Sequence, residues 1–473
     1  DQTRIDRLLG THASLAPGEI NTQRKDLDAR IDLKGESWRF RAGHQGFLNV
    51  GTGAGVILAL DPNGDFNTRL NNADITYDFI KSSQWDITAQ MSYLGTLTEA
   101  SLNPYPPGIF GRAFPDGLKD DFQFRVDEIR AGITALYGGI SNHRIRFGIG
   151  TSYTRLSDVE ESRNFKILPN GMPLPLPFSN VLTFGEQPLL AEHDRQLWYG
   201  FAQDEWWFAP DWILTTGARL DHYSDFGTTI NPRVALVWNA SSSLTAKALY
   251  GRAFRAPSFT ELYGNSTIAV LGNLNLKPEI INMIEFSLTK QWDPQLRTNA
   301  SLFGYSLDDQ IRGGIESSNP LVKMQKRNTL GRHGYGMELE SEYAATKDLR
   351  FQASYAYFSF DDAATNDRGR FMPKHQLSAG FDWHITDYWM LNTRLDWVSK
   401  RELMYENKKA VVDSYPWASV SLRYSDPKDW FFSVTLDNAL DIDAAEPSVF
   451  PSVPYGIPLP GRSLMGQFGW RFR

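Results

Sequence analysis

The chain has 473 residues and no cysteine, which excludes disulfide bonds, cysteine metal sites and thiol nucleophiles. Its 48 lysine and arginine residues are outnumbered by 55 aspartate and glutamate residues, and the formal net charge is −7. This balance argues against a nucleic acid partner, because phosphate backbones are bound by basic faces.

Strict alternation of apolar and polar residues begins near the N-terminus and recurs to the end of the chain. It is clear in LDARIDLKG (27–35), in LRFQASYAY (349–357) and in SLMGQFGWRF (463–472). A period of two over eight to ten residues predicts a half-buried β-strand, whereas amphipathic helical patterns are nearly absent. No stretch approaches the roughly eighteen apolar residues of a membrane-spanning helix.

In chain order, the alternation predicts nineteen strands. Their expected ranges are 24–34, 37–50, 70–80, 85–100, 121–139, 143–158, 191–208, 212–224, 230–239, 243–253, 280–292, 296–310, 330–344, 349–361, 372–384, 388–401, 412–425, 429–440 and 460–472.

The connections between these strands are alternately short and long. Turns such as APDW (209–212) contrast with long stretches such as 159–190 and 254–279. Tight turns at one end and long loops at the other are typical of an antiparallel transmembrane β-barrel with periplasmic turns and extracellular loops. The sequence therefore predicts an all-β transmembrane barrel.

Tryptophan positions give a second indication of a membrane barrel. Eleven of the fourteen lie within a few residues of a short turn or of the C-terminus. Indole rings favour the membrane–water boundary, so such residues form girdles around a barrel. The alternative is a soluble β protein with ordinary core tryptophans, but a core would not concentrate them at one end of every hairpin.

The strand count predicts that the barrel is incomplete at its N-terminal side. The first and the last predicted strands are both expected to run down to the periplasm. Because successive strands alternate in direction, the number of strands between residues 1 and 473 must then be odd. Bacterial single-chain barrels have even numbers of strands. We therefore expect at least one further strand before residue 1.

Several motifs in the C-terminal half resemble the barrel of a TonB-dependent outer-membrane receptor. They occur in the order and approximate spacing of that family: NPRVALVW (231–238), YGRAFRAPSFTELY (250–263), NLKPE (275–279), GYGMELE (334–340), DNALD (437–441) and LPGRSLMGQFGWRF (459–472), with QDEW (203–206) upstream.

The resemblance implies a 22-stranded barrel that encloses an N-terminal plug domain. On this basis residues 1–473 are expected to be the barrel domain without its plug and first three strands, in the outer membrane of a Gram-negative bacterium. Such receptors import scarce ligands, usually ferric siderophores and sometimes haem, cobalamin or sugars. The TonB complex supplies the energy through an N-terminal region. The resemblance implies no enzyme activity and no resident cofactor, since any iron would be carried by the ligand.

Two other functions remain open at this point. One is a passive, porin-like channel in the same membrane. The other is a soluble carbohydrate-binding protein or hydrolase. A membrane barrel would have outer-membrane lipid and lipopolysaccharide as partners, whereas a soluble protein would not.

The candidate ligand-binding residues lie at the expected outer mouth. Arg252 and Arg255 end the strand 243–253, where guanidinium groups could contact an anionic ligand. The favoured interpretation is that they anchor the following loop, bonding backbone carbonyls or the carboxylates Glu261 and Glu279. Further candidates for ligand contact are aromatic residues of the loops: Tyr263, Tyr105, Phe110, Phe114 and the stretch 165–178.

No pattern typical of catalysis or of a metal site stands out. The eight histidines are scattered, and no HExxH motif occurs. DPNGD (61–65) is favoured as an Asn-Gly turn over a calcium loop, and AEHDR (191–195) as a solvated loop end over a metal or acid–base group. On the strands, lumen-facing charges are expected to form cross-strand ion pairs: Asp28, Asp32, Asp86 and Asp396 with Arg30, Arg39, Arg41 and Arg394.

Overall fold

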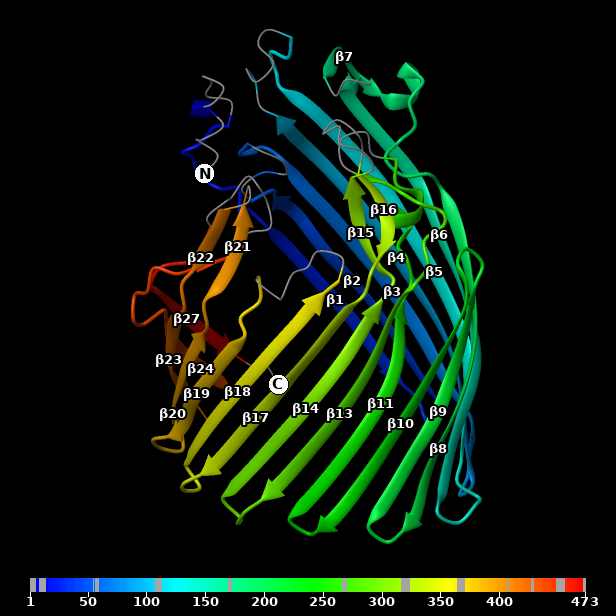
Figure 1. Cartoon of the computed structure of the whole chain (residues 1–473), viewed down its shortest axis with the longest axis vertical. Helices are drawn as coiled ribbons and strands as arrows, with labels where there is room; N and C mark the ends of the chain where they lie inside the picture. Colours follow the sequence, from blue (N-terminus) through cyan, green and yellow to red (C-terminus); the bar gives the residue numbers. More distant parts are fainter. Residues whose placement is uncertain are drawn as a thin grey trace.

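The structure, a computed structural model, consists almost entirely of antiparallel β-strands. It describes residues 6–7, 14–53, 55, 59–105, 107, 113–168, 172–265, 270–315, 324–363, 371–405, 408–426, 429–447 and 456–470. Twenty strands form one large sheet that curves into a tilted barrel wall (Figure 1). Among the described residues, no helix is both long and apolar enough to cross a membrane. The predicted all-β antiparallel fold is confirmed.

The strands of the large sheet follow one another around the wall in chain order. They are β1 (Lys25–Lys34), β2 (Trp38–Gly51), β3 (Asp65–Lys81), β4 (Trp85–Tyr105), β5 (Leu118–Tyr137), β6 (His143–Ile167), β7 (Pro173–Asn180), β8 (His193–Ala209), β9 (Trp212–Tyr223), β10 (Gly227–Ser241), β11 (Leu244–Arg255), β13 (Glu279–Gln291), β14 (Leu296–Asp308), β17 (Arg332–Ala344), β18 (Leu349–Asp362), β19 (His375–His384), β20 (Trp389–Val398), β23 (Tyr415–Ser425), β24 (Trp430–Asp437) and β27 (Ser463–Trp470).

Each strand pairs with its neighbours in sequence, and only β7 departs from this rule. It pairs with the upper part of β6, while the lower part of β6 pairs with β8. Within the described part of the chain, β1 pairs only with β2 and β27 only with β24.

Each of the nineteen predicted ranges overlaps one strand of the sheet, but some predicted ends were wrong. β6 continues to Ile167 instead of ending at 158, and β3 begins at Asp65 instead of 70. β4, β5 and β6 contain 21, 20 and 25 residues, about twice what a bilayer requires, and they rise above the rest of the wall (Figure 1). Above the membrane neither face needs to be apolar, so the alternation that predicts strands fades there.

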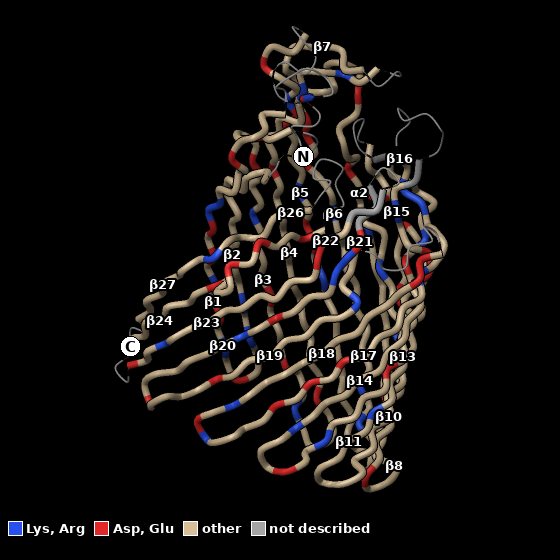
Figure 2. Tube along the Cα trace, turned by 60° about the vertical axis from the view of Figure 1, so that its left-hand side comes forward, with Lys and Arg blue, Asp and Glu red and all other residues tan. Residues whose placement is uncertain are grey.

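The two faces of the wall differ as a membrane barrel requires. One face exposes large apolar side chains such as Phe79, Ile149 and Phe468, and we call it the membrane face. The other, the lumen face, carries the predicted charges, and only two of their ion pairs cross between strands as predicted: Arg39 with Asp32, and Arg41 with Asp74. The other two lie within one strand, because Arg30 lies 2.6 Å from Asp28 in β1 and Arg394 lies 2.8 Å from Asp396 in β20. Asp86 instead accepts a hydrogen bond from Thr88 Oγ1 at 3.5 Å. Basic and acidic residues are interspersed along the strands (Figure 2).

The long loops contain secondary structure that the sequence did not predict. β12 (Val270–Leu271), β15 (Gln310–Ile315) and β16 (Met324–Thr329) form a small sheet. β21 (Arg401–Tyr405) pairs with β22 (Lys408–Val412), and β25 (Ala445–Glu446) with β26 (Ile457–Pro458). Within the described residues, the loops also contain the short helices η1 (Val181–Phe184) and α2 (Phe259–Tyr263).

Candidate functional site

Arg255 fastens the loop that follows β11. Its Nε donates to Glu279 Oε2 at 2.7 Å, and its two terminal nitrogens donate to Glu261 at 2.9 and 3.1 Å. Glu261 also closes the N-terminus of α2, because it accepts from the backbone N–H of Ser258 at 2.8 Å while the Ser258 hydroxyl accepts from the backbone N–H of Glu261. These are the two carboxylates that the anchoring interpretation names for this arginine.

A second arginine, Arg195, holds the same loop from β8, which is separated from β11 by β9 and β10. It pairs with Asp225 at 2.6 Å and donates to the carbonyl oxygen of Pro257 at 2.8 Å. Its guanidinium also lies 4.7 Å from the ring centroid of Phe259. The sequence predicts a solvated loop end for the stretch 191–195. Ala191, Glu192 and Asp194 are exposed, but the prediction was wrong for Arg195, whose side chain is only 13% exposed.

The aromatic candidates pack within the loops. The Tyr263 ring lies 3.9 Å from the ring of His193 and packs against the buried cluster of Leu262, Leu276 and Ile311. Tyr105 packs against a second cluster, formed by Phe114, Leu118 and Phe165. Phe114 is only 2% exposed, so a ligand could reach its ring only after this cluster opened. Phe110 lies outside the described residues.

Arg252 lies apart from the anchor and lines a cavity of about 410 Å³ on the barrel wall. We call this cavity the arginine pocket because four arginines, from β6, β9, β10 and β11, are among its lining residues. Its lining residues are Arg146, Phe201, Ala202, Gln203, Ala218, Arg219, Asn231, Arg233, Arg252, Ala253 and Phe254. The sequence thus grouped Arg252 with Arg255, but the structure places the two in different environments.

The register of the sheet creates the pocket. Five residues lie directly opposite one another in a single row across β6, β8, β9, β10 and β11. In that order they are Arg146, Gln203, Gly217, Arg233 and Gly251. Side chains of directly opposed residues share a face, so this row presents long polar groups alternating with glycines. A Cβ atom added to Gly251 would meet nothing within 4 Å, so the missing side chain leaves open space.

The pocket carries a surplus of positive charge. Arg219 is neutralised by Asp221, to which it donates at 2.6 to 2.9 Å, and its guanidinium stacks 4.0 Å from the centroid of Tyr199. Arg146, Arg233 and Arg252 form no ion pair with any described residue. Arg146 lies over the ring of Phe201 at 5.7 Å instead.

Three polar atoms of the pocket residues are buried and lack a hydrogen-bond partner within the described part of the chain. They are Oε1 of Gln203, Oδ1 of Asn231 and Nε of Arg252. An unmade hydrogen bond of a buried group costs about 1–3 kcal/mol, so such groups usually mark a place where a ligand, water or another protein segment binds.

Sequence reasoning missed Arg146, Arg219 and Arg233 as a group. They lie on three separate strands, and only the strand register brings them together. The available signal was NPRVALVW (231–238), whose arginine shares its strand face with Asn231 and therefore belongs to the polar side.

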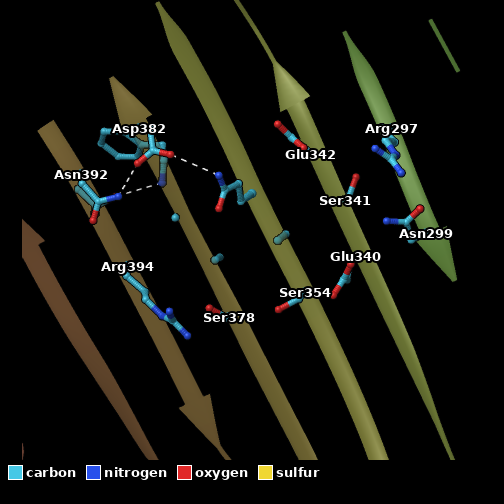
Figure 3. Close-up of a pocket in the computed structure, with 16 residues that line it drawn as sticks. Arg297, Asn299, Glu340, Ser341, Glu342, Ser354, Ser378, Asp382, Asn392 and Arg394 are labelled. Atoms are coloured by element: carbon cyan, nitrogen blue, oxygen red, sulfur yellow. Dashed lines mark hydrogen bonds between the residues drawn. The ribbon is translucent and has the colours of Figure 1, made fainter. Parts of the chain in front are cut away.

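A second polar cavity, of about 580 Å³, lies on the lumen face between β14 and β20 (Figure 3). It also contains two arginines, Arg297 and Arg394, but here carboxylates outnumber them. Arg394 is paired with Asp396, and Asp382 accepts from Gln352 Nε2 at 3.3 Å and from Asn392. This cavity therefore has more carboxylates than arginines, in contrast to the arginine pocket, although Oδ1 of Asn299 in its lining also lacks a partner among the described residues.

No group of three or more His, Asp or Glu side chains in the described residues is arranged to hold a metal ion. In the DPNGD stretch, Asp61 accepts from the backbone N–H groups of Gly64 and Asn103 at 2.8 and 2.9 Å, so it stabilises a turn and the adjoining strand.

Comparison with known proteins agrees with this architecture. Residues 15–439 match the family model for the β-barrel of TonB-dependent receptors. An iron-regulated outer membrane virulence protein of Vibrio cholerae is 30% identical over 207 residues, which cover 40% of this chain and 32% of that protein. A vitamin B12 transporter of the same species is 26% identical over 270 residues, covering 55% of this chain and 41% of the transporter.

Among solved structures, the siderophore receptor PirA of Acinetobacter baumannii superposes with a TM-score of 0.72 at 15% identity. The match covers 98% of this chain and 73% of PirA, so it supports the fold. The matched segments span a third to two fifths of the length of the two Vibrio relatives. The family model, the barrel fold and these relatives lead to one conclusion: the chain belongs to the TonB-dependent receptors of the Gram-negative outer membrane, a family of receptors and not of enzymes.

Proposed function

We propose that the chain forms the barrel wall of a receptor that imports an anionic ferric siderophore, with the arginine pocket as a contact for the ligand's negative charge. The observation that carries this proposal is the set of three arginines without an ion pair, Arg146, Arg233 and Arg252, in a cavity whose residues also include three unsatisfied buried polar atoms, one of them Nε of Arg252 itself. Guanidinium groups bind oxygen anions through charge-assisted hydrogen bonds, which are about twice as strong as neutral ones.

The local charge is informative because it opposes the charge of the whole chain. The chain has a net charge of −7, yet four arginines and no carboxylate line this one cavity. Ferric tris-catecholate complexes are trianions whose oxygen atoms surround the metal, so they match such a pocket. In this proposal iron is cargo held by the siderophore, and the protein needs no cofactor of its own.

Transport against a gradient requires energy, which the TonB complex would deliver through the N-terminal part of a receptor of this family. Active transport distinguishes the proposal from a passive, porin-like channel. Cobalamin remains the second candidate ligand, because one relative is named a vitamin B12 transporter. Haem and carbohydrates have no specific observation in their favour.

A ligand panel tests the proposal. The protein in detergent is titrated with a ferric tris-catecholate, a neutral ferric tris-hydroxamate and cyanocobalamin, and binding is followed by tryptophan fluorescence. We expect the tris-catecholate to bind tightest and to weaken most with added salt. Tighter binding of cyanocobalamin, or salt-independent binding of all three ligands, would refute an anionic ferric siderophore as the ligand.

A further inference from the structure

We propose that residues 185–190 form a strap that stays closed over the inner face of β5 and β6 while Asp120 and Glu161 share one proton, and that opens when this proton is lost. The strap follows η1 and leads towards β8, at the extracellular end of the barrel. The proposal does not depend on which ligand the receptor imports.

Two contacts fasten the strap to β6. Glu186 Oε2 accepts from Arg163 Nη2 at 2.7 Å, and the backbone N–H of Leu189 donates to Glu161 Oε2 at 2.5 Å. Both partners on β6 are buried, because the side chain of Arg163 is 2% exposed and that of Glu161 is 5% exposed. The strap is therefore bound to charged groups that water hardly reaches.

The strap also joins β6 to the loop that contains α2. The carbonyl oxygen of Leu189 accepts from the backbone N–H of Asn265 at 2.7 Å, and Leu190 forms an isolated β-bridge with Gly264. At its other end the strap begins with Gly185, whose φ of 70° lies in the left-handed region that glycine adopts without strain. This glycine is a natural hinge for the strap.

The charged groups under the strap face the lumen side, above the membrane. Asp120 lies near the upper end of β5, in the part that rises above the rest of the wall (Figure 1). It is an odd number of residues from Ile129, which is exposed on the membrane face, so it belongs to the other face. Arg163 lies directly opposite Asp120, and Glu161 is two residues before Arg163, so all three share this face.

This buried cluster contains one carboxylate more than its cations can balance. Glu161 and Glu186 both pair with Arg163, at 3.0 and 2.7 Å, and Lys166 supplies a second cation 3.6 Å from Glu186. Asp120 is the third carboxylate, and its Oδ1 is buried without a hydrogen-bond partner in the part of the chain that the structure describes. Burial disfavours such a surplus of negative charge, so the cluster is expected to take up a proton.

A proton on Asp120 removes this surplus. β4 places the uncharged Leu102 opposite Asp120, and the adjacent Asp121 adds further negative charge. Burial and the neighbouring Glu161 raise the pKa of Asp120 to about 7, and burial also raises the pKa of Glu161. A protonated Asp120 donates a hydrogen bond to Glu161, which keeps Glu161 in place as the acceptor for the strap.

The sign of the pH dependence follows from these values. In the closed form Asp120 keeps its proton up to about pH 7, whereas a fully solvated aspartate loses it near pH 4. The closed form therefore binds more protons between these two values, and its stability falls as the pH rises through this window. Above it, two buried carboxylates repel each other, and opening the strap lets water reach both.

A nitroxide label on the strap tests the proposal in the detergent-solubilised protein. Gln187 is exposed and the chain has no cysteine, so Gln187→Cys provides one labelling site. We expect the mobile fraction of the label to rise at least roughly threefold between pH 5.5 and pH 8.5. Asp120→Asn keeps the shape of the side chain and supplies an amide that donates to Glu161 at any pH, so in this background the label should stay immobile at both values.

Asp121→Asn is the matched control, because it removes the adjacent carboxylate on the opposite face, where Asp121 accepts from the Ser101 hydroxyl. The pH response should persist in it, and a label on Thr260→Cys in α2 should stay immobile from pH 5.5 to pH 8.5. The heat-dependent mobility shift of barrels on gels verifies that every variant is folded. The proposal is overturned if the label at residue 187 does not respond to pH, if it responds equally in Asp120→Asn, or if the label at residue 260 is released with it.

Discussion

Arg255 at the end of β11 and Glu279 at the start of β13 are bonded across the strand pair at 2.7 Å, and this bond closes the loop that lies between them. Glu261 joins the same guanidinium from within α2. The residue 255 side chain is 47% exposed, whereas both carboxylates are mostly covered. One arginine therefore satisfies two carboxylates that would otherwise be poorly solvated.

Arg255→Gln should loosen this loop without unfolding the barrel. The exposed arginine limits the expected loss to about 1 kcal/mol of local stability. Hydrogen exchange of residues 258–264 should become several-fold faster, while exchange in β13 stays unchanged. Arg30→Gln, which removes an exposed ion pair elsewhere on the wall, is the control and should leave this loop as it is. Unchanged exchange in Arg255→Gln would show that the anchor does not hold α2.

The anchor should also respond to acid. Burial acts to raise the pKa of Glu261, but the hydrogen bonds from Arg255 and Ser258 outweigh it, and the net pKa lies below its ordinary value. A carboxylate with a lowered folded-state pKa contributes stability above its unfolded pKa and loses it as the pH falls through the folded value. The loop should therefore be ordered at neutral pH and loosen below about pH 4.

Because the chain has no cysteine, Thr260→Cys provides a unique site for a nitroxide label on α2. The label should be immobile at pH 7 and mobile at pH 3. In a Glu261→Gln background it should be mobile at both values. If the mobility of the label does not change with pH either with Glu261 present or in the Glu261→Gln background, the assigned role of Glu261 is contradicted.

The buried cluster over β5 and β6 should depend on Phe165, which is fully buried against Phe114 and Leu118. Phe165→Ala should cost about 3–5 kcal/mol of local stability, because a large core side chain is removed. Protease cleavage between residues 113 and 118 should then accelerate. Phe178→Ala is the matched control, since that ring is exposed on β7, and equal cleavage in both variants would refute the cluster.

The assignment of the two faces is tested by adding a charge to each. Ile149 is 68% exposed on the membrane face, and Ile149→Arg should cost about 2–4 kcal/mol when the protein is in a bilayer. Ser354→Arg places the same charge on the lumen wall beside Glu340 and should be nearly neutral. Urea unfolding in lipid vesicles measures both, and the reverse order would mean that the faces are exchanged.

Strands could be predicted from the sequence wherever a membrane faces one side of them. Alternation is then enforced by lipid outside and water inside, so all nineteen predicted ranges overlap a strand. β7, β15 and β16 could not be predicted, because they lie in loops where neither face meets lipid. Their pairing depends on the loop packing onto itself.

The site was only partly predictable for a related reason. Arg255 and its two glutamates lie within 24 residues of one another, so their connection could be proposed from the motif. The arginine pocket combines Arg146 with Arg252, which are 106 positions apart, and depends on the register of five strands. A single sequence contains the residues of such a pocket but not the register that assembles them.

The most direct test of the central claim is the affinity for a ferric tris-catecholate in the double variant Arg233→Gln/Arg252→Gln, measured across a range of salt concentrations. We predict at least tenfold weaker binding than in the wild type and a shallower dependence on salt, because two charge-assisted contacts are lost. Arg394→Gln, which removes a lumen-face arginine already paired with Asp396, should bind as the wild type does. Wild-type affinity in the double variant, with the same salt dependence, would contradict a ligand-binding role for the arginine pocket.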